Sequence, residues 1–524
     1  MNKTLIAVAL GIALVIGGIV LSKNAAMPGS NTVLTKAEPA KAFETVELKN
    51  GDTYDLTASY VEKDINGVSY KMLAYNGSIP GPMIKVPQGA EVTINFKNGT
   101  DMNTLLHSHG VRMDNEFDGS QSTQEEMKPG ETFSYKLKFP DAGMYWYHPH
   151  VREDLQQELG LYGNYLVVAT DEKYWNEVNR EIPLILDDVL IENGKINLSK
   201  KEADRTLMGR YGNVMLVNGE TDYELTATAG EVIRFYLTNV ANVRPFNFSI
   251  KGAQLKLVGG DAGATEREEW KDSVILGPSE RVVIEVLFAK EGTYTLEHST
   301  PEKTYELGKV TVSGGVASPY FGDIFGTLRT NEIAKASIDP YREYLNKPID
   351  KEISLTIDMM GGMSSGMGGH RMPDGSMMGG GMMMGGEVSA DGIEWEDIDM
   401  AMMNQMATKD MTKWKIVDKA TGKANEDIDW SFKTGDKVKV RITNDKDSAH
   451  PMQHPIHFHG QRFLVVNENG TANDNLVWKD TVMVPAGQYV DILLDTTNPG
   501  EWMAHCHIAE HLEAGMMFGF TVSE

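Results

Sequence analysis

The chain of 524 residues has a net charge of -25, 30 methionines and a single cysteine. Its acidic balance excludes nucleic acid as a partner, because phosphate recognition requires a basic face, and it favours cations, including metal ions. The lone Cys506 excludes an internal disulfide, so its thiol is an inert core residue, a nucleophile or a metal ligand. At roughly 150 residues per domain, the length suggests about three domains.

Near the N-terminus, Lys3 precedes an apolar run from Leu5 to Leu21. A charged start followed by an apolar centre is typical of a secretory signal, and the run is also close to the shortest length that can span a membrane. We therefore expect a periplasmic or extracellular protein. Whether the segment is cleaved or kept as a membrane anchor stays open, and membrane contact is expected only if it is kept. Residues 22–42 are predicted to be a linker.

Short β-type runs separated by Gly, Pro, Asn and Asp follow from residue 43 onward, with few long helical patterns. A Gly-containing turn, a β-type strand and a polar turn recur at 89–98, 230–239 and 435–444. Three copies and the chain length together predict an all-β protein with one β-sandwich domain repeated three times. We place the domains at residues 43–170, 171–345 and 346–524.

Residues 359–411 break this pattern, since they hold 15 of the 30 methionines and many glycines without a strand or helix period. This composition predicts a flexible insertion in the third domain. Thioether sulfur is a soft ligand that favours Cu(I), so the segment is either a collector of Cu(I) or a linker without a metal role.

Ten of the 13 histidines fall in four clusters. These are His107 with His109; His148 with His150; His454 with His457 and His459; and His505 with His507, followed by His511. Two histidines at i and i+2 of a strand point to one face, and such an imidazole pair is a natural chelate for copper or zinc. His298 and His370 have no assigned role.

The last cluster is the most specific, because Cys506 points to the face opposite its neighbours His505 and His507. A metal bound by the thiolate would therefore lie across the strand from a metal bound by both imidazoles. Cysteine, two histidines and a weak axial methionine form a blue-copper electron-transfer site. Here these are Cys506, His454, His511 and Met516. Zinc is the alternative metal, although zinc sites do not need an axial Met.

The four motifs, in this order along the chain, resemble those of the multicopper oxidase family, and the resemblance covers essentially the whole chain after residue 43. It implies three cupredoxin-like Greek-key β-sandwich domains and four copper ions. The type 1 copper would be held by His454, Cys506, His511 and Met516. The type 2 copper would be held by His107 and His457, and the type 3 pair by His109, His148, His150, His459, His505 and His507.

The resemblance also implies the reaction. Cys506 would pass single electrons from a donor through the flanking His505 and His507 to the three-copper cluster, where dioxygen is reduced to water. Asp118 matches an acidic residue that assists the cluster in the family, and Glu510 is a second candidate for this role. Some members carry an acid directly after the last ligand histidine, and this chain departs from them with Leu512.

The Met-rich insertion resembles that of the periplasmic copper-efflux oxidases, which implies Cu(I) as donor and a role in copper tolerance. The same resemblance implies Asp358, His450 and Met452 as ligands of the substrate copper, although His450 stands where those relatives carry Asp. A laccase-type oxidase of phenols or other small organic donors is the alternative, and a non-catalytic copper-binding protein is a third hypothesis. We expect a monomer.

Overall fold

The computed structural model describes residues 37–198, 202–359, 370–371, 377–378, 389–397 and 412–524. The predicted signal segment and most of the Met-rich insertion lie outside these residues. From Glu38 to Glu524 the chain forms one unit. Among the described helices, none has the length and apolar character needed to cross a membrane.

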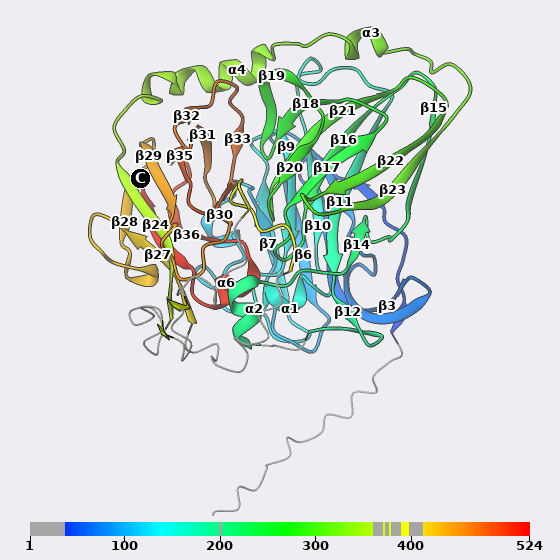
Figure 1. Ribbon diagram of the computed structural model, residues 1–524. Helices are drawn as coiled ribbons and strands as arrows, with labels where there is room; N and C mark the ends of the chain where they lie inside the picture. Colours follow the sequence, from blue (N-terminus) through cyan, green and yellow to red (C-terminus); the bar gives the residue numbers. More distant parts are fainter. Residues whose placement is uncertain (1–36, 199–201, 360–369, 372–376, 379–388, 398–411) are drawn as a thin grey trace, which may run out of the picture. The chain divides into compact units, whose positions relative to one another are not determined.

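The first ten strands form the N-terminal group, drawn in blue and cyan in Figure 1. One sheet has the order β1-β3-β6-β8 with β4 added to β3, and the other has the order β2-β5-β10-β9-β7. The elements are β1 (Glu38–Pro39), β2 (Thr45–Glu47), β3 (Thr53–Ile65), β4 (Val68–Tyr75), β5 (Met83–Pro87), β6 (Glu91–Asn98), β7 (His107–His109), η1 (Asn115–Phe117), β8 (Thr132–Lys138), β9 (Gly143–His148), α1 (Glu153–Gln156) and β10 (Gly163–Val168).

The middle group, green in Figure 1, contains a six-stranded sheet, β14-β11-β16-β21-β18-β19, a five-stranded sheet, β15-β23-β22-β17-β20, and the pair β12-β13. Its elements are β11 (Arg180–Val189), β12 (Ile191–Glu192), β13 (Lys195–Ile196), α2 (Glu202–Met208), β14 (Val214–Val217), β15 (Tyr223–Thr228), β16 (Glu231–Asn239), β17 (Phe246–Lys251), β18 (Leu255–Gly260), β19 (Gly263–Lys271), β20 (Val274–Leu276), β21 (Arg281–Phe288), β22 (Gly292–Ser299), β23 (Thr304–Ser313), α3 (Gly322–Phe325), α4 (Glu332–Ile338) and η2 (Asp339–Tyr344).

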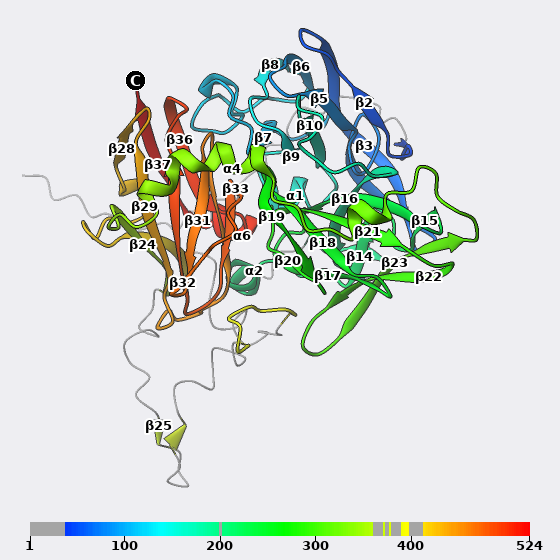
Figure 2. The same cartoon turned by 90° about the horizontal axis from the view of Figure 1, so that it is seen from above.

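The C-terminal group, which is drawn from yellow-green to red in Figure 2, contains the sheet β27-β24-β29-β35-β31-β32 with β33 added to β31, the sheet β28-β37-β36-β30-β34, and the pair β25-β26. Its elements are β24 (Lys351–Met359), β25 (His370–Arg371), β26 (Met377–Met378), β27 (Thr412–Asp418), η4 (Asn425–Asp427), β28 (Trp430–Lys433), β29 (Lys437–Asn444), β30 (His454–Phe458), β31 (Arg462–Glu468), β32 (Thr471–Ala472), β33 (Trp478–Lys479), β34 (Thr481–Val484), β35 (Tyr489–Asp495), β36 (Gly500–Cys506), α6 (Ala509–Glu513) and β37 (Met517–Ser523).

The repeat found in the sequence corresponds to one strand position in each group. β6 pairs in parallel with β3 and antiparallel with β8. β16 pairs in the same way with β11 and β21, and β29 pairs with β24 and β35. Each group thus repeats the same local topology, and the predicted all-β class is confirmed.

The cores explain the two strand patterns of the sequence. In β6, Val92, Ile94 and Phe96 are buried while the alternate residues are at least partly exposed, so one face of the strand packs inward. β16 lies inside a six-stranded sheet and is buried along its whole length, as its nearly continuous apolar run predicts. Three large apolar clusters result, each drawn mainly from one group.

Candidate metal centres

Two antiparallel strand pairs position most of the predicted histidines opposite one another. β7 pairs with β9 so that His107 lies opposite His148, and β30 pairs with β36 so that His457 lies opposite His505. The i, i+2 spacing then places two imidazoles on one face of each strand. All ten clustered histidines are buried, each with 2% or less of its surface exposed. Burial on this scale requires partners for the ring nitrogens.

Eight of these imidazoles meet between the N-terminal and C-terminal groups, where β7 lies next to β30 (Figure 1). The rings of His109 and His457 stack with their centroids 3.7 Å apart, and those of His107 and His459 are 4.1 Å apart. Two further pairs join the groups, His148 with His507 at 5.0 Å and His150 with His505 at 5.4 Å. Side chains about 350 positions apart in the sequence thus form one cluster.

The imidazoles of this cluster use one ring nitrogen for a hydrogen bond to the surrounding protein and point the other nitrogen toward the middle of the cluster. His107 donates from Nδ1 to the Asp118 carbonyl at 2.7 Å, and His457 donates from Nδ1 to the Asp480 carbonyl at 2.8 Å. His109 uses the opposite nitrogen, because its Nε2 contacts the Asp480 carboxylate at 3.0 Å and its Nδ1 points toward the cluster. A ring that donates one N–H presents a lone pair at the other nitrogen, which is how metal-bound histidines are oriented.

The inward nitrogens fit copper. Six of them are buried without a hydrogen-bond partner among the described residues, namely Nε2 of His107, His148, His150, His457 and His507 and Nδ1 of His109. The other two, Nε2 of His459 and of His505, face each other at 3.0 Å. Burial lowers the pKa of His107 and His507 to about 3, so both rings are neutral, the form that binds metal.

A second, smaller centre surrounds Cys506, which is fully buried at the end of β36. Its Sγ lies 3.6 Å from Nδ1 of His454 and 3.6 Å from Nδ1 of His511, and these two nitrogens are 3.3 Å apart. Met516 is fully buried, and its carbonyl accepts the Cys506 amide N–H. Burial raises the pKa of the Cys506 thiol well above its ordinary value, so a bound cation is needed to hold it as the thiolate.

Three ligand atoms converge in the smaller centre, and eight imidazole rings meet in the larger one. His505 and His507 flank Cys506 in the chain. This combination defines a copper oxidase with one thiolate-bound centre and one all-imidazole cluster. Models of the multicopper oxidase family match residues 57–172, 166–313 and 396–524. The chain belongs to the multicopper oxidase family and is an oxygen-reducing oxidoreductase, which excludes the non-catalytic hypothesis.

Individual relatives agree with this assignment. The chain is 26% identical over 466 residues to a multicopper oxidase of Staphylococcus aureus, covering 86% of this chain and 84% of that protein. It is 24% identical to copper resistance protein A of Escherichia coli, covering 90% and 93%. A solved multicopper oxidase of Campylobacter jejuni, described as a metallo-oxidase, is 25% identical with a TM-score of 0.69 and covers 94% and 96%.

Asp118 and Glu510 occupy different surroundings. Asp118 is fully buried, and its carboxylate lies 3.0 Å from Nδ1 of His459. Burial raises the pKa of Asp118, but His459 and His107 outweigh this effect and lower it to about 2. Glu510 lies on α6 and pairs with Arg210 at 3.2 Å. Burial raises the pKa of Glu510, which Arg210 partly offsets. Asp118 is therefore an anion that contacts the cluster, whereas Glu510 pairs with an arginine.

The three candidate ligands of the substrate copper differ in their exposure to solvent. Asp358 is exposed on β24 and forms an ion pair with Lys415 of β27. His450 and Met452 are buried in the segment before β30. Of the histidines without an assigned role, His298 is buried in the middle group and accepts the Asn247 amide N–H at 3.0 Å.

Several residues of these centres were not predicted. Glu394 is buried and lies 4.0 Å from His450. The ring of Trp414 lies against that of His511, with centroids 4.2 Å apart and the planes tilted. Asp480 joins the cluster from the segment between β33 and β34. Asp480 precedes Thr481, which pairs with His457. Asp480 could therefore have been found from the sequence only by predicting which strand pairs with β30, because that strand begins directly after Asp480.

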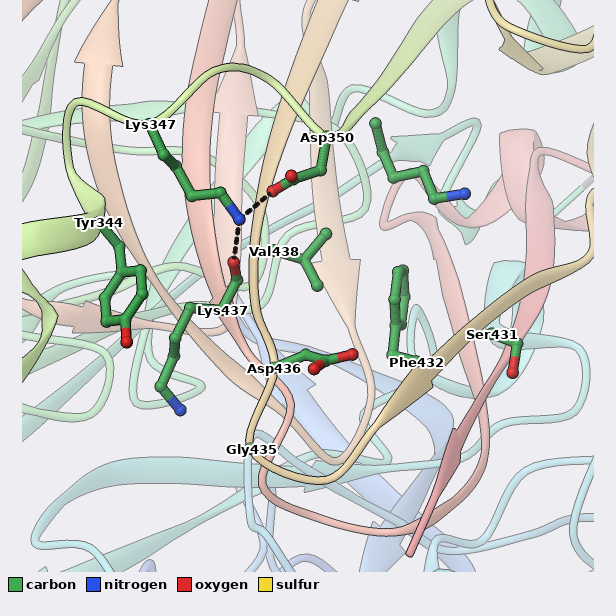
Figure 3. Close-up of a pocket in the computed structure, with 10 residues that line it drawn as sticks. Tyr344, Lys347, Asp350, Ser431, Phe432, Gly435, Asp436, Lys437 and Val438 are labelled. Carbon is green, nitrogen blue, oxygen red and sulfur yellow. Dashed lines mark hydrogen bonds and ion pairs between the residues drawn. The ribbon is translucent and has the colours of Figure 1, made fainter.

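A separate surface pocket of about 450 Å³ is lined by residues of η2, β24, β28 and β29 and of the turns between them (Figure 3). There Lys347 pairs with Asp350 at 2.6 Å and donates to the Lys437 carbonyl at 2.7 Å. None of the predicted copper ligands lines this pocket, so it is not part of either metal centre.

Proposed function

We propose that the electron donor of this multicopper oxidase is Cu(I), and that the enzyme serves copper tolerance. The observation that carries the proposal is a buried carboxylate and a buried imidazole, Glu394 and His450, which lie 4.0 Å apart beside the thiolate-bound centre. Oε2 of Glu394 has no hydrogen-bond partner among the described residues. A buried carboxylate of this kind suits a cation, which would neutralise its charge.

The position of this pair suits electron transfer. His450 precedes the copper ligand His454 by four residues. The ring of Trp414 lies 6.2 Å from that of His450 and 4.7 Å from that of His454. The buried Met452 lies between the two histidines in the chain and would add a soft ligand suited to Cu(I). A donor ion at Glu394 and His450 would thus lie one aromatic ring away from the first acceptor.

The segment that carries Glu394 is held in place by hydrogen bonds. The Glu394 amide N–H donates to the Gln453 side chain at 2.8 Å, and its carbonyl accepts from the Tyr211 hydroxyl at 2.8 Å. Arg244 donates to the Trp395 carbonyl at 3.0 Å. Because Gln453 directly precedes His454, the carboxylate is fixed relative to the centre that would accept the electron.

Bound copper supplies the redox chemistry, which is one-electron transfer at the thiolate centre and four-electron reduction of dioxygen to water at the cluster. The protein supplies the connections. Cys506 joins the two centres through the backbone to His505 and His507. Asp118 would orient His459 through the 3.0 Å contact and keep a negative charge at the cluster.

The test is oxygen uptake by the copper-loaded enzyme, with Cu(I) and a phenol as alternative donors. We expect Glu394→Gln to raise the KM for Cu(I) at least tenfold and to leave phenol oxidation unchanged. Asp358→Asn is the matched control, since that carboxylate is exposed and paired with Lys415, and it should change neither activity. If Glu394→Gln changes neither activity, and phenols remain the better donors, the laccase alternative is correct.

A deletion separates the Met-rich insertion from Glu394. Removing residues 360–388 leaves the segment 389–397 and its hydrogen bonds in the chain. If the methionines deliver Cu(I), this deletion lowers the Cu(I) turnover at limiting Cu(I) and leaves the turnover at saturation intact. Equal Cu(I) rates with and without these residues would show that they are a linker.

We also propose that the protein is exported, with the apolar run from Leu5 to Leu21 as the signal or anchor. Fractionation of cells that express the full chain tests this proposal, and the N-terminal sequence of the recovered protein shows whether the run is cleaved. Recovery only from the cytoplasm would contradict it.

A further inference from the structure

Glu153 is a buried carboxylate that neither the motifs nor the proposed donor site uses. It begins α1, and its side chain is 1% exposed. Neither Oε1 nor Oε2 has a hydrogen-bond partner among the described residues. An ionised carboxylate without donors is costly in a protein interior, so a group in this position requires a cation or a proton.

Two other acids of this region, Asp154 and Glu158, differ from Glu153 because each has a basic partner. Asp154 pairs with Arg152 at 2.7 Å, and Glu158 pairs with Arg210 at 3.5 Å. Glu153 instead lies near the acids Asp154 and Glu513, whose charges oppose its ionisation further. No arginine or lysine in the described part of the chain forms an ion pair with Glu153.

The ion-pair contact that Glu153 makes is with a histidine of the cluster. Its Oε1 lies 3.5 Å from Nε2 of His150. Nδ1 of His150 faces the Gln121 side-chain oxygen at 3.3 Å, so Nε2 is the nitrogen left to bind a metal. The carboxylate and the ligating lone pair therefore occupy the same side of the ring.

The backbone between the two residues directs Glu153 back toward the cluster. Arg152 adopts the left-handed conformation, with φ 50° and ψ 52°. This conformation is unfavourable for a side chain without special local bonding. It turns the chain after His150, so that the residue three positions later contacts the same imidazole.

We propose that Glu153 is a carboxylate ligand of the copper held by His150, in addition to the eight imidazoles of the cluster. The cation would neutralise a carboxylate that otherwise has no positive partner. The anionic oxygen would in turn stabilise the oxidised copper ion at that position. The other type 3 copper, which has only imidazole ligands, would lack this stabilisation. The proposal rests on the copper cluster of the family and is independent of the identity of the donor.

The test compares Glu153→Gln with Glu158→Gln, which makes the same change at a buried acid that pairs with Arg210. Copper binding to each full-length protein is measured by competition with a chromophoric chelator, and the type 3 near-ultraviolet absorption is recorded. We expect Glu153→Gln to weaken binding of one cluster copper by about 10- to 100-fold and to change that absorption. Glu158→Gln should leave both unchanged.

The thermal midpoint of the metal-free protein separates a ligand from a packing residue. Glu153→Gln should leave this midpoint unchanged or raise it, because it removes an unpaired buried carboxyl group. A further variant, Glu153→Ala, should regain copper affinity when formate is added. Unchanged copper affinity and absorption in Glu153→Gln would overturn the proposal, as would equal losses in the two glutamine variants. Neither result depends on Cu(I) oxidation, so the proposed donor is judged separately.

Discussion

The Asp480 carboxylate links all three strand groups, so its substitution tests the orientation of a cluster ligand. Its Oδ1 accepts from His109 of the N-terminal group at 3.0 Å and from Arg281 of the middle group at 2.7 Å. Asp480→Asn offers an amide N–H in place of one oxygen. If that N–H faces Nε2 of His109, the ring must carry its proton on Nδ1, the nitrogen that would bind copper. Loss of the correct tautomer should weaken copper binding by about 10- to 100-fold.

The cost in stability follows from the arginine. Arg281 is fully buried, and breaking a buried ion pair by removing one charge costs roughly 3–5 kcal/mol. Arg281 keeps hydrogen bonds to the carbonyls of Met144 and Ser279 and lies 4.0 Å from Asp261. We therefore expect the lower end, about 3 kcal/mol, for Asp480→Asn in the metal-free protein.

A double variant separates the two effects. Arg281→Met combined with Asp480→Asn removes the unpaired charge, so most of the lost stability should return while copper binding stays weak. Urea unfolding of the metal-free protein measures the first quantity, and chelator competition measures the second. Normal copper affinity in Asp480→Asn, or recovery of affinity together with stability in the double variant, would refute the argument from the His109 tautomer.

Two further predictions concern the thiolate centre and the donor site. Cys506→Ser should lower the bound copper by one ion per chain and abolish both the blue absorption and the oxidation of the donor, while the absorption of the cluster persists. Retained donor oxidation would contradict the electron route through the sulfur. Burial, helped by Asp397, raises the pKa of Glu394 to about 8, against an ordinary value of about 4.3. The unfolded chain therefore loses this proton first, and the metal-free protein should lose stability as pH rises from about 4 to 8. Glu394→Gln should flatten that part of a urea-unfolding profile, and an unaltered slope would show that the carboxyl group titrates normally.

The strand pattern and the histidine spacing could be predicted because both depend on neighbours in the sequence. The alternation in β6 and the continuous apolar run in β16 reflect a half-buried and a fully buried strand. The shared face of His107 and His109 likewise needs only the strand period. The reversed ring of His109 could not be predicted, since its tautomer is set by Asp480, which is 371 positions away.

The proposed donor site was harder to predict, because spacing does not fix which face of a strand points inward. Asp358 was chosen by spacing and lies on the exposed face of β24. Glu394 was overlooked because it lies within a segment whose Gly and Met content predicts flexibility. The contacts of Glu394 with Gln453 and Tyr211 come from other parts of the chain and leave no local pattern.

The division of the cluster between β7 and β9 on one side and β30 and β36 on the other has a consequence for biogenesis. During synthesis, the emerging N-terminal group carries only two of the four histidine motifs until the last strands are complete. Copper that arrives early thus meets half of a binding site and is held weakly. Tight binding acts only on the finished chain and, by mass action, stabilises the docking of its first and last strand groups. The fraction of copper that a preparation retains in the presence of a competing chelator therefore also measures the fraction of molecules that have completed folding.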